Sequence, residues 1–135
     1  MNVTDIPFAH YIGIEQENDT LSLGFHSNVM NHLNTLHASA QFALAETESG
    51  MYLQTLFPEL ARKVVPVLRD AQMKYRQPAV AKIFAVASSD GDAVKKFRMQ
   101  FGKKGRGLLE VRVEVKDINN TLTSQAIFTW FVQAR

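Results

Sequence analysis

The stretch from residue 38 to residue 56 constrains the fold more than any other part of the chain. Its alanines, leucines and methionine have high helix propensity, and Pro58 follows where the helix is expected to end. Its only charged side chains are the carboxylates of Glu46 and Glu48, so the predicted helix is apolar almost all round. Such a helix must be largely enclosed by protein. A carboxylate inside that enclosure is costly unless it is paired, hydrogen-bonded or kept for chemistry.

Alternating apolar and polar residues predict strands in much of the remaining chain. Residues 109–116 alternate most regularly, and the apolar side chains of this stretch are expected to face the core: Leu109, Val111, Val113 and Val115. Residues 20–26 also alternate, with Leu21, Leu23 and Phe25 expected on one face. Further strands are expected at residues 64–77, 81–88 and 121–132, and short helices or turns at residues 6–12 and 92–101.

Proline, aspartate and glycine refine these boundaries. Because Pro66 has no backbone N–H, the segment 64–77 is expected to be bent or to lie at a sheet edge. Asp90 is the expected N-cap of the helix at 92–101, and Gly102 its expected end. One long helix followed by several strands with short connections predicts a single α+β domain over residues 1–135, with the helix across one face of an antiparallel sheet.

Composition limits the classes of function. The 135 residues are 46% hydrophobic and 21% charged, as in an ordinary globular protein. The net charge is only +2 although the pI is about 9.0, which favours a local basic patch for an anionic ligand over the binding of nucleic acid. The N-terminus has no signal-like segment and no apolar run is long enough to span a bilayer, so a cytoplasmic protein without a membrane partner is expected.

Metal chemistry is not expected from this sequence. The chain contains no cysteine, which excludes disulfides and thiolate metal sites. Its histidines at positions 10, 26 and 32 show no metal-ligand spacing with carboxylates.

Several short motifs resemble the phenylacetyl-CoA-type acyl-CoA thioesterases of the hotdog-fold superfamily. Asn31, the triplet at 37–39 (His-Ala-Ser) and the triplet at 44–46 (Leu-Ala-Glu) are similar to that group's Asn…His-Gly-Gly…Leu-Ala-Asp pattern at the same spacing. Residues 12–15, 75–78 and 105–117 resemble further segments, so the resemblance covers most of the chain. It implies an antiparallel curved sheet of five or six strands wrapped around one long central helix.

The chain departs from the pattern at two places. His-Gly-Gly has become His-Ala-Ser, and the acid at position 46 is Glu where that group usually has Asp. Other hotdog thioesterases place Glu on this helix. A backbone donor after the histidine survives the change from Gly to Ala as long as the local φ is negative.

The resemblance implies a thioester hydrolase whose substrate is an acyl-CoA, with no cofactor apart from the coenzyme A of the substrate. Glu46 is the implied base or direct nucleophile, and the N–H of Ala38 the implied oxyanion donor. Asn31 and His37 are expected to position the reactants. Because active sites of this superfamily lie between protomers, a homodimer or a dimer of dimers is expected.

Residue spacing on the helix leaves some alternatives open. Gln41, Glu48 and Thr55 form a polar stripe at seven-residue spacing, whereas Glu46 is followed by Leu53, and this contrast favours Glu46 over Glu48 as the catalytic acid. The alternative for Glu46 is a structural carboxylate at a dimer interface. For His37 the alternatives are a base and a residue that caps or orients the helix start, and orientation is favoured. Asn31 is about equally well interpreted as an ordinary loop residue. Gln41 and Thr47 are candidates for lining the pocket, and the helix surface is the default expectation for both.

Basic residues concentrate in one later segment: Lys95, Lys96, Lys103, Lys104 and Arg106. Lys103, Lys104 and Arg106 are the candidates for binding the phosphates of coenzyme A, and a solvated surface is the alternative. Lys74 and Arg76 are expected to add to this patch. The rival functions are a non-catalytic acyl-CoA or fatty-acyl binding module and a dehydratase of 3-hydroxyacyl thioesters, which would need His37 as its base.

Overall fold

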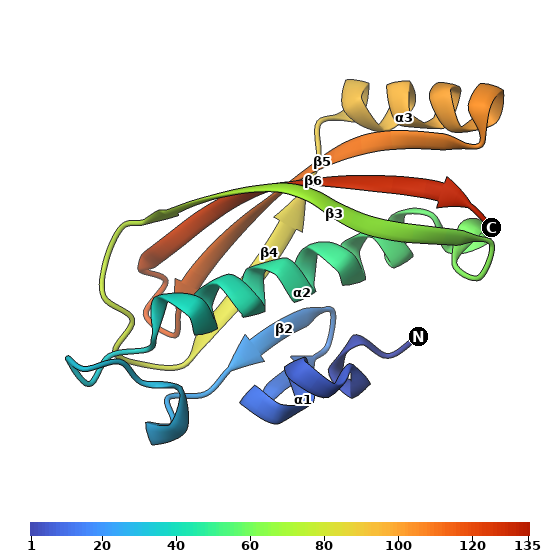
Figure 1. The fold of residues 1–135 in the computed structure, drawn as a ribbon. Coiled ribbons are helices and arrows are strands. Elements are labelled where there is room, and N and C mark those ends of the chain that lie inside the picture. Colours follow the sequence, from blue (N-terminus) through green and yellow to red (C-terminus); the bar gives the residue numbers. More distant parts are fainter.

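The computed structural model describes residues 1–135 and has the predicted architecture, a curved antiparallel sheet around one long helix (Figure 1). The helix is α2 (Ala38–Leu56), with the predicted bounds. The sheet has six strands: β1 (Ile14–Glu17), β2 (Thr20–Leu23), β3 (Val64–Tyr75), β4 (Ile83–Ser88), β5 (Arg106–Asp117) and β6 (Leu122–Ala134). Their spatial order is β1-β2-β4-β5-β6-β3, with antiparallel neighbours throughout.

Shorter helices complete the chain: α1 (Pro7–Ile12), α3 (Gly91–Lys104) and 3-10 turns at Val3–Asp5, Ser27–Val29 and Pro58–Leu60. The sequence did not predict strand β1, because only Ile14 of its four residues is buried and the others are polar. The prediction for residues 20–26 was wrong at its end. β2 stops at Leu23, and Phe25 lies 41% exposed beyond it.

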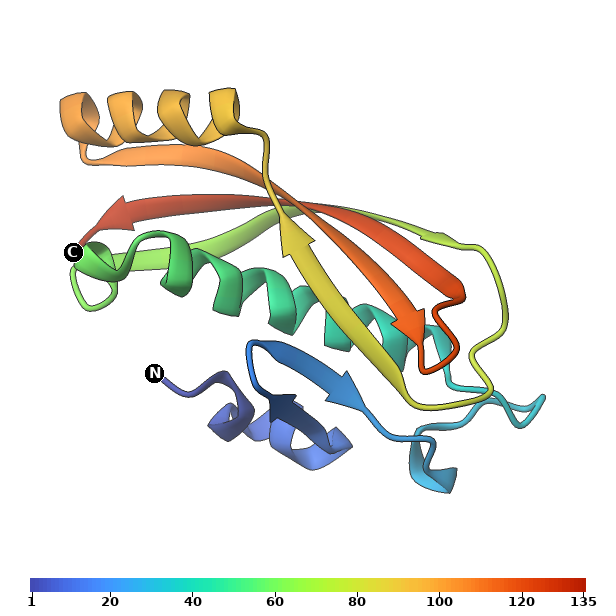
Figure 2. The same ribbon diagram turned by 180° about the vertical axis from the view of Figure 1, so that it is seen from behind.

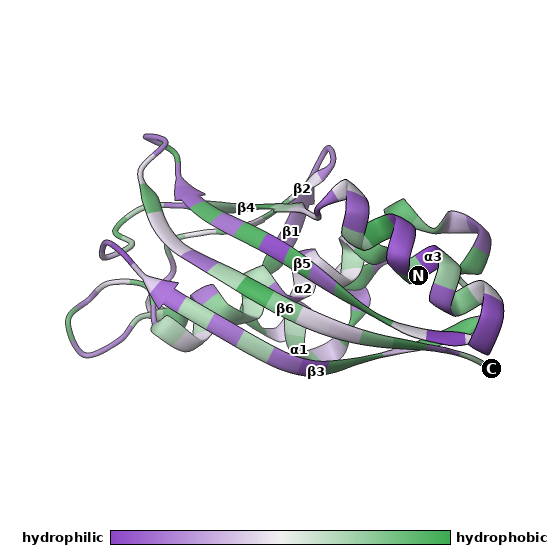
Figure 3. Ribbon diagram, turned by 90° about the horizontal axis from the view of Figure 1, so that it is seen from above, coloured by the Kyte–Doolittle hydropathy of each residue, from purple (hydrophilic) through white to green (hydrophobic).

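The alternation of β5 builds the inner face of the sheet as predicted. Leu109, Val111, Val113 and Val115 are each at most 1% exposed, and they pack in the core with Leu44 and Phe128. Seen from above, hydrophobic and hydrophilic residues alternate along this strand (Figure 3). The period of two therefore directs one set of side chains toward the core that contains α2 and leaves the charged set on the outer face.

The two edges of the sheet differ in length. β3 contains Pro66 and is an edge strand of 12 residues, as the proline predicted, and its register with β6 shifts between Leu68 and Asp70. The other edge is β1, with four residues. One long row of backbone N–H and C=O groups is therefore free, along the outer side of β3.

Helix α3 covers the half of β5 that β4 does not reach. The last pair between those strands is Ser88 with Arg112, so residues 106–111 have no strand beside them on that side, and α3 packs along β5 there (Figures 1 and 2). The ring of Phe97 is 1% exposed and its centroid lies 4.9 Å from that of Phe57. A Cβ on Gly107 would lie 2.9 Å from Phe97, so this close packing needs glycine.

The predicted end of α3 was wrong by one turn. Gly102 lies inside the helix, which continues to Lys104 and is capped by Gly105 in the left-handed conformation (φ 67°). The N–H of Gly105 donates to the carbonyl of Phe101. Either glycine could end a helix from sequence alone, but only the later one lies where the chain reverses into β5. Asp90 is the N-cap residue, although its side chain makes no capping hydrogen bond.

Candidate active site

The N-terminus of α2 has a free backbone donor. His37 is the N-cap, and its Nδ1 accepts a hydrogen bond from the N–H of Ser39 at 3.0 Å, while its carbonyl accepts the N–H groups of Ala40 and Gln41. The N–H of Ala38 has no acceptor in this turn, and the residue is exposed. An unpaired amide at a helix N-terminus carries partial positive charge and can donate to an oxyanion. The side chain of His37 therefore orients this turn.

A cavity of about 350 Å³ opens at this helix end. Its walls come from the loop before α2, the first turn of α2 and the end of β3: Asn31, Leu33, Thr35, Leu36, Ala38, Gln41, Tyr75, Arg76, Gln77 and Pro78. The hydroxyl of Tyr75 donates to the carbonyl of Ala38 at 2.9 Å, and burial raises the pKa of this tyrosine. Asn31 and Ala38, two of the predicted site residues, thus line one cavity.

The side chain of Asn31 is engaged in its own loop. Its Oδ1 accepts hydrogen bonds from the N–H groups of Leu33 at 2.8 Å and Thr35 at 3.1 Å, and its Nδ2 donates to the hydroxyl of Thr35 at 2.8 Å. These bonds fix the loop that forms one wall of the cavity. In this conformation Asn31 shapes the site through the backbone around it.

Gln41 is a buried polar residue of the cavity at the N-terminus of α2. It is only 3% exposed, and its Oε1 is buried without any hydrogen-bond partner. The default expectation of the helix surface was wrong for Gln41, because the polar stripe of α2 faces into the protein along Gln41 and Glu48. The alternative, that Gln41 lines the pocket, agrees with the structure. Thr47 is half-buried, and its hydroxyl donates to the carbonyl of Ala43 at 2.6 Å.

Glu46 is half-buried, and burial raises the pKa of its carboxyl above the ordinary value. It lies eight residues after Ala38, which corresponds to about 12 Å along a helix. The cavity at the N-terminus of α2 does not include Glu46. One thioester carbonyl therefore cannot contact the N–H of Ala38 and the carboxylate of Glu46 from the same chain.

Glu48 has different surroundings, two residues farther along. It is 4% exposed, and its Oε1 accepts the backbone N–H of Leu21 in β2 at 3.0 Å. Burial raises the pKa of Glu48 to about 7, and the hydrogen bond from Leu21 opposes this rise. Glu48 lines a second cavity, between β2 and β4, which Ala38 does not reach.

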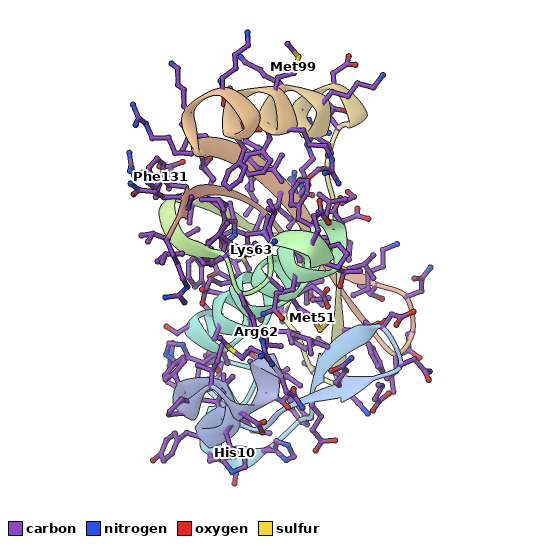
Figure 4. The ribbon with its side chains drawn as sticks, turned by 90° about the vertical axis from the view of Figure 1, so that its right-hand side faces the viewer. His10, Met51, Arg62, Lys63, Met99 and Phe131 are labelled. Atoms are coloured by element: carbon purple, nitrogen blue, oxygen red, sulfur yellow. The ribbon has the colours of Figure 1, made fainter.

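The basic residues do not converge on the N-terminus of α2 within one chain. Arg106 pairs with Gln133 at one end of β6, whereas Tyr75 pairs with Ser124 at the other, a separation of about 30 Å along a strand. Helix α3 and the N-terminus of α2 accordingly lie at opposite ends of the molecule (Figure 1). Lys95, Lys96, Lys103 and Lys104 line a shallow hollow of about 420 Å³ on α3 itself, and Met99 points outward from the same helix (Figure 4).

Lys74 and Arg76, near the end of β3, line different cavities. Arg76 lines the cavity at the N-terminus of α2, and its Nε donates to Oε1 of Gln125 at 3.2 Å. Lys74 lines another hollow, on the outer face of the sheet, with Gln72 and Arg112. The expectation that Lys74 and Arg76 share one patch with the α3 lysines was therefore wrong. No group of three or more histidine and carboxylate side chains could hold a metal, and no helix has the length and apolarity of a membrane span.

A comparison of the sequence with family models decides the family. Residues 10–132 match the model described as a domain of unknown function, DUF4442. The chain belongs to this family. No curated protein matches this DUF4442 chain.

Solved structures share the hotdog fold of this DUF4442 chain. A probable thioesterase of unknown function from Pseudomonas aeruginosa superposes with a TM-score of 0.84 at 19% identity, covering 98% of this chain and 91% of the other. A Bacillus halodurans protein crystallised with CoA superposes with a TM-score of 0.70 at 22% identity, covering 93% of this chain and 74% of the other. A mutant of the phenylacetic acid degradation protein PaaI from Thermus thermophilus superposes with a TM-score of 0.68 at 18% identity, covering 93% of this chain and 97% of the other.

Proposed function

We propose that this DUF4442 protein hydrolyses acyl-CoA thioesters. The observation that carries the proposal is the unpaired N–H of Ala38, exposed at a helix N-terminus that lines a cavity of about 350 Å³. The fold supports it, because similar structures include a probable thioesterase and a protein crystallised with CoA. The second support is the carboxyl of Glu46, whose pKa is raised by burial and which is therefore a better base than an exposed glutamate.

In the proposed reaction a water molecule attacks the thioester carbonyl carbon. Glu46 takes a proton from this water as the new C–O bond forms, and the N–H of Ala38 donates to the oxygen that becomes negative. The C–S bond then breaks, and the thiolate of coenzyme A leaves and takes up a proton. In the alternative route the carboxylate of Glu46 attacks first, forming a mixed anhydride that water hydrolyses. His37 holds the helix turn in place, and Asn31 holds the neighbouring loop.

We propose that two chains build each active site. Ala38 and Glu46 are about 12 Å apart along α2, too far for one carbonyl carbon, so the oxyanion donor of one chain would meet the partner subunit's Glu46. The free edge of β3 offers an interface for this assembly, because its 12 residues can pair with β3 of a second copy. A homodimer or a dimer of dimers is therefore part of the proposed function.

Lys103, Lys104 and Arg106 are proposed to bind the phosphates of coenzyme A. Because they lie about 30 Å from the N-terminus of α2 in the same chain, they would serve the active site of another chain in the assembly. Arg76 lines the cavity beside Ala38 and is a further candidate for a negative group of the substrate.

A panel of acyl-CoA esters of differing chain length and polarity tests the proposal. The folded protein is mixed with each ester, and release of free thiol is followed by a colorimetric thiol reagent. We expect catalytic release from at least one ester and none from a buffer control. Binding of the esters without thiol release would contradict hydrolysis and favour a binding module. Loss of water from a 3-hydroxyacyl-CoA without thiol release would favour a dehydratase.

A further inference from the structure

A second cavity lies where strands β2 and β4 part. The two strands pair over three residues each, ending at Leu21 with Ala85, and β4 then continues through Val86 and Ala87 without a partner on that side. From behind, β4 can be seen to run away from β2 beyond this point (Figure 2). The opening encloses about 510 Å³ and is bounded by these strands, the second half of α2 and residues 1–3. We call it the Glu48 cavity.

Glu48 lies at the point where the strands part. Its side chain comes from α2, and its Oε1 accepts the N–H of Leu21 at the last residue of β2 that pairs with β4. The other oxygen, Oε2, has no hydrogen-bond partner and is not among the buried unpaired atoms, so it is open to the cavity. One carboxylate oxygen thus completes the sheet, and the other is available to a ligand.

The hydrogen bond to Leu21 does not explain why position 48 is an acid. A glutamine would accept the same bond with a neutral amide. The carboxylate adds a large desolvation cost, since Glu48 is 4% exposed. Within the chain only the hydrogen bond from Leu21 offsets part of that cost, because no lysine, arginine or histidine lines the cavity. A cationic ligand would supply the missing compensation.

The other lining residues favour an organic cation over an inorganic one. Asp19 adds a second carboxylate at the entrance, and Tyr52 adds an aromatic ring. Met51 points from α2 toward the side of the β1–β2 hairpin (Figure 4), where it adds apolar surface together with Ala87. An ammonium group is attracted by carboxylates and by the face of an aromatic ring, while its hydrocarbon part is attracted by apolar walls.

We propose that the Glu48 cavity is a second ligand site, which binds a small organic amine as its ammonium ion beside Glu48. The site is separate from the thioesterase site, since neither Ala38 nor Glu46 lines the Glu48 cavity. The proposal does not depend on thioester hydrolysis. The remaining titratable groups of the cavity are Asp19, Tyr52 and the α-amino group of Met1, and Met1 is 85% exposed, so it does not neutralise Glu48.

Isothermal titration calorimetry with benzylamine and benzyl alcohol tests this proposal. The two molecules have nearly the same size and differ in charge, so an ammonium site should bind the amine at least about 10-fold more tightly. Glu48→Gln, which keeps the acceptor for Leu21, should weaken benzylamine binding by at least about 10-fold. Glu46→Gln is the matched control on the same helix and should bind benzylamine as the parent does.

The pH dependence supplies an independent readout. Near pH 6 Glu48 is largely protonated, because burial raises its pKa to about 7, and amine binding must then release its proton. Benzylamine affinity should therefore rise between about pH 6 and about pH 8, and Glu48→Gln should remove this rise. If Glu48→Gln does not fold, two other measurements replace it. Tyr52→Leu should bind benzylamine more weakly than the parent, and the parent protein should release protons when it binds benzylamine near pH 6.

Three results would overturn the proposal. The first is equal affinity for benzyl alcohol and benzylamine. The second is parental benzylamine affinity in folded Glu48→Gln or, where that variant does not fold, in Tyr52→Leu. The third is no heat of binding at millimolar benzylamine, which would leave Glu48 with the structural task of completing the sheet at Leu21.

Discussion

Two carboxylates two residues apart on α2 have different surroundings. Glu46 is half-buried and lies outside the cavity at the N-terminus of the helix, whereas Glu48 is almost fully buried and hydrogen-bonded to β2. Helical periodicity alone predicts that neighbouring positions point in different directions, but not which side of the helix the strands cover. The sequence therefore distinguished the two acids and favoured Glu46 as the catalytic one. It did not show that the polar stripe from Gln41 to Glu48 faces inward.

Substitutions of the two acids should affect the rate of acyl-CoA hydrolysis differently. Glu46→Gln removes the proposed base and should lower the rate of acyl-CoA hydrolysis by about 100-fold to 10,000-fold with the fold intact. Glu48→Gln keeps the bond to Leu21 and should retain most activity. Thiol release by the purified, folded variants is the measurement. Parental activity in Glu46→Gln would show that the base has been assigned to the wrong residue.

Glu48 should also make stability depend on pH. Burial raises its pKa to about 7 in the folded protein, from an ordinary value of 4.5 that holds in the unfolded chain. Between these values the folded state keeps a proton that the unfolded state has lost, so the free energy of unfolding falls as pH rises, by at most about 3 kcal/mol. Urea unfolding of the parent and of Glu48→Gln across this range measures the difference. A parent that gains stability relative to the variant with rising pH would contradict the assignment.

The unpaired amide of Gln41 predicts opposite effects on stability and function. Gln41→Leu removes a buried oxygen without a partner and should raise the free energy of unfolding by about 1 kcal/mol. The same change removes a polar group from the wall of the cavity beside Ala38 and should raise KM for the preferred acyl-CoA. Thermal unfolding and initial rates check the two effects. A less stable variant with unchanged KM would indicate that Gln41 is paired in the assembled protein and has no part in binding substrate.

At the scale of elements, segments with a long and consistent local signal were predicted best. The inward face of β5 agrees with the structure because its apolar residues alternate regularly. The bounds of α2 agree because helix-forming residues continue up to the stop at Pro58. β1 was missed because only one of its four residues is buried, which leaves no alternation to detect. The end of α3 was misplaced because Gly102 and Gly105 have the same chemistry, and only tertiary packing selects the second.

The basic end of α3 gives a prediction at this scale. Changing Lys103, Lys104 and Arg106 together to Ala should raise KM for an acyl-CoA and weaken its dependence on salt, because exposed contacts with phosphates are screened by added ions. The matching acyl-pantetheine has no nucleotide phosphates and should be affected little. An equal loss of activity on both thioesters would show that the change acts through the packing of α3 on β5.

At the scale of the whole molecule, the proposed active site requires a second copy. A long free edge at β3 and the separation of Ala38 from Glu46 both favour a dimer or a larger assembly. Light scattering coupled to size exclusion, at micromolar protein, should give at least twice the 15.2 kDa of one chain. A single species of one-chain mass with full activity would contradict both the assembly and the shared active site.

The packing of α3 on β5 has a consequence for how copies of this chain can associate. Because α3 occupies the side of β5 beyond β4, and β1 is only four residues long, β3 is the single extended edge at which another strand can add. Two copies joined edge to edge at β3 would use up both of these edges and close the assembly around a two-fold axis. A chain with a second long edge could recruit further copies and grow into a filament, and α3 protects this protein from such polymerisation.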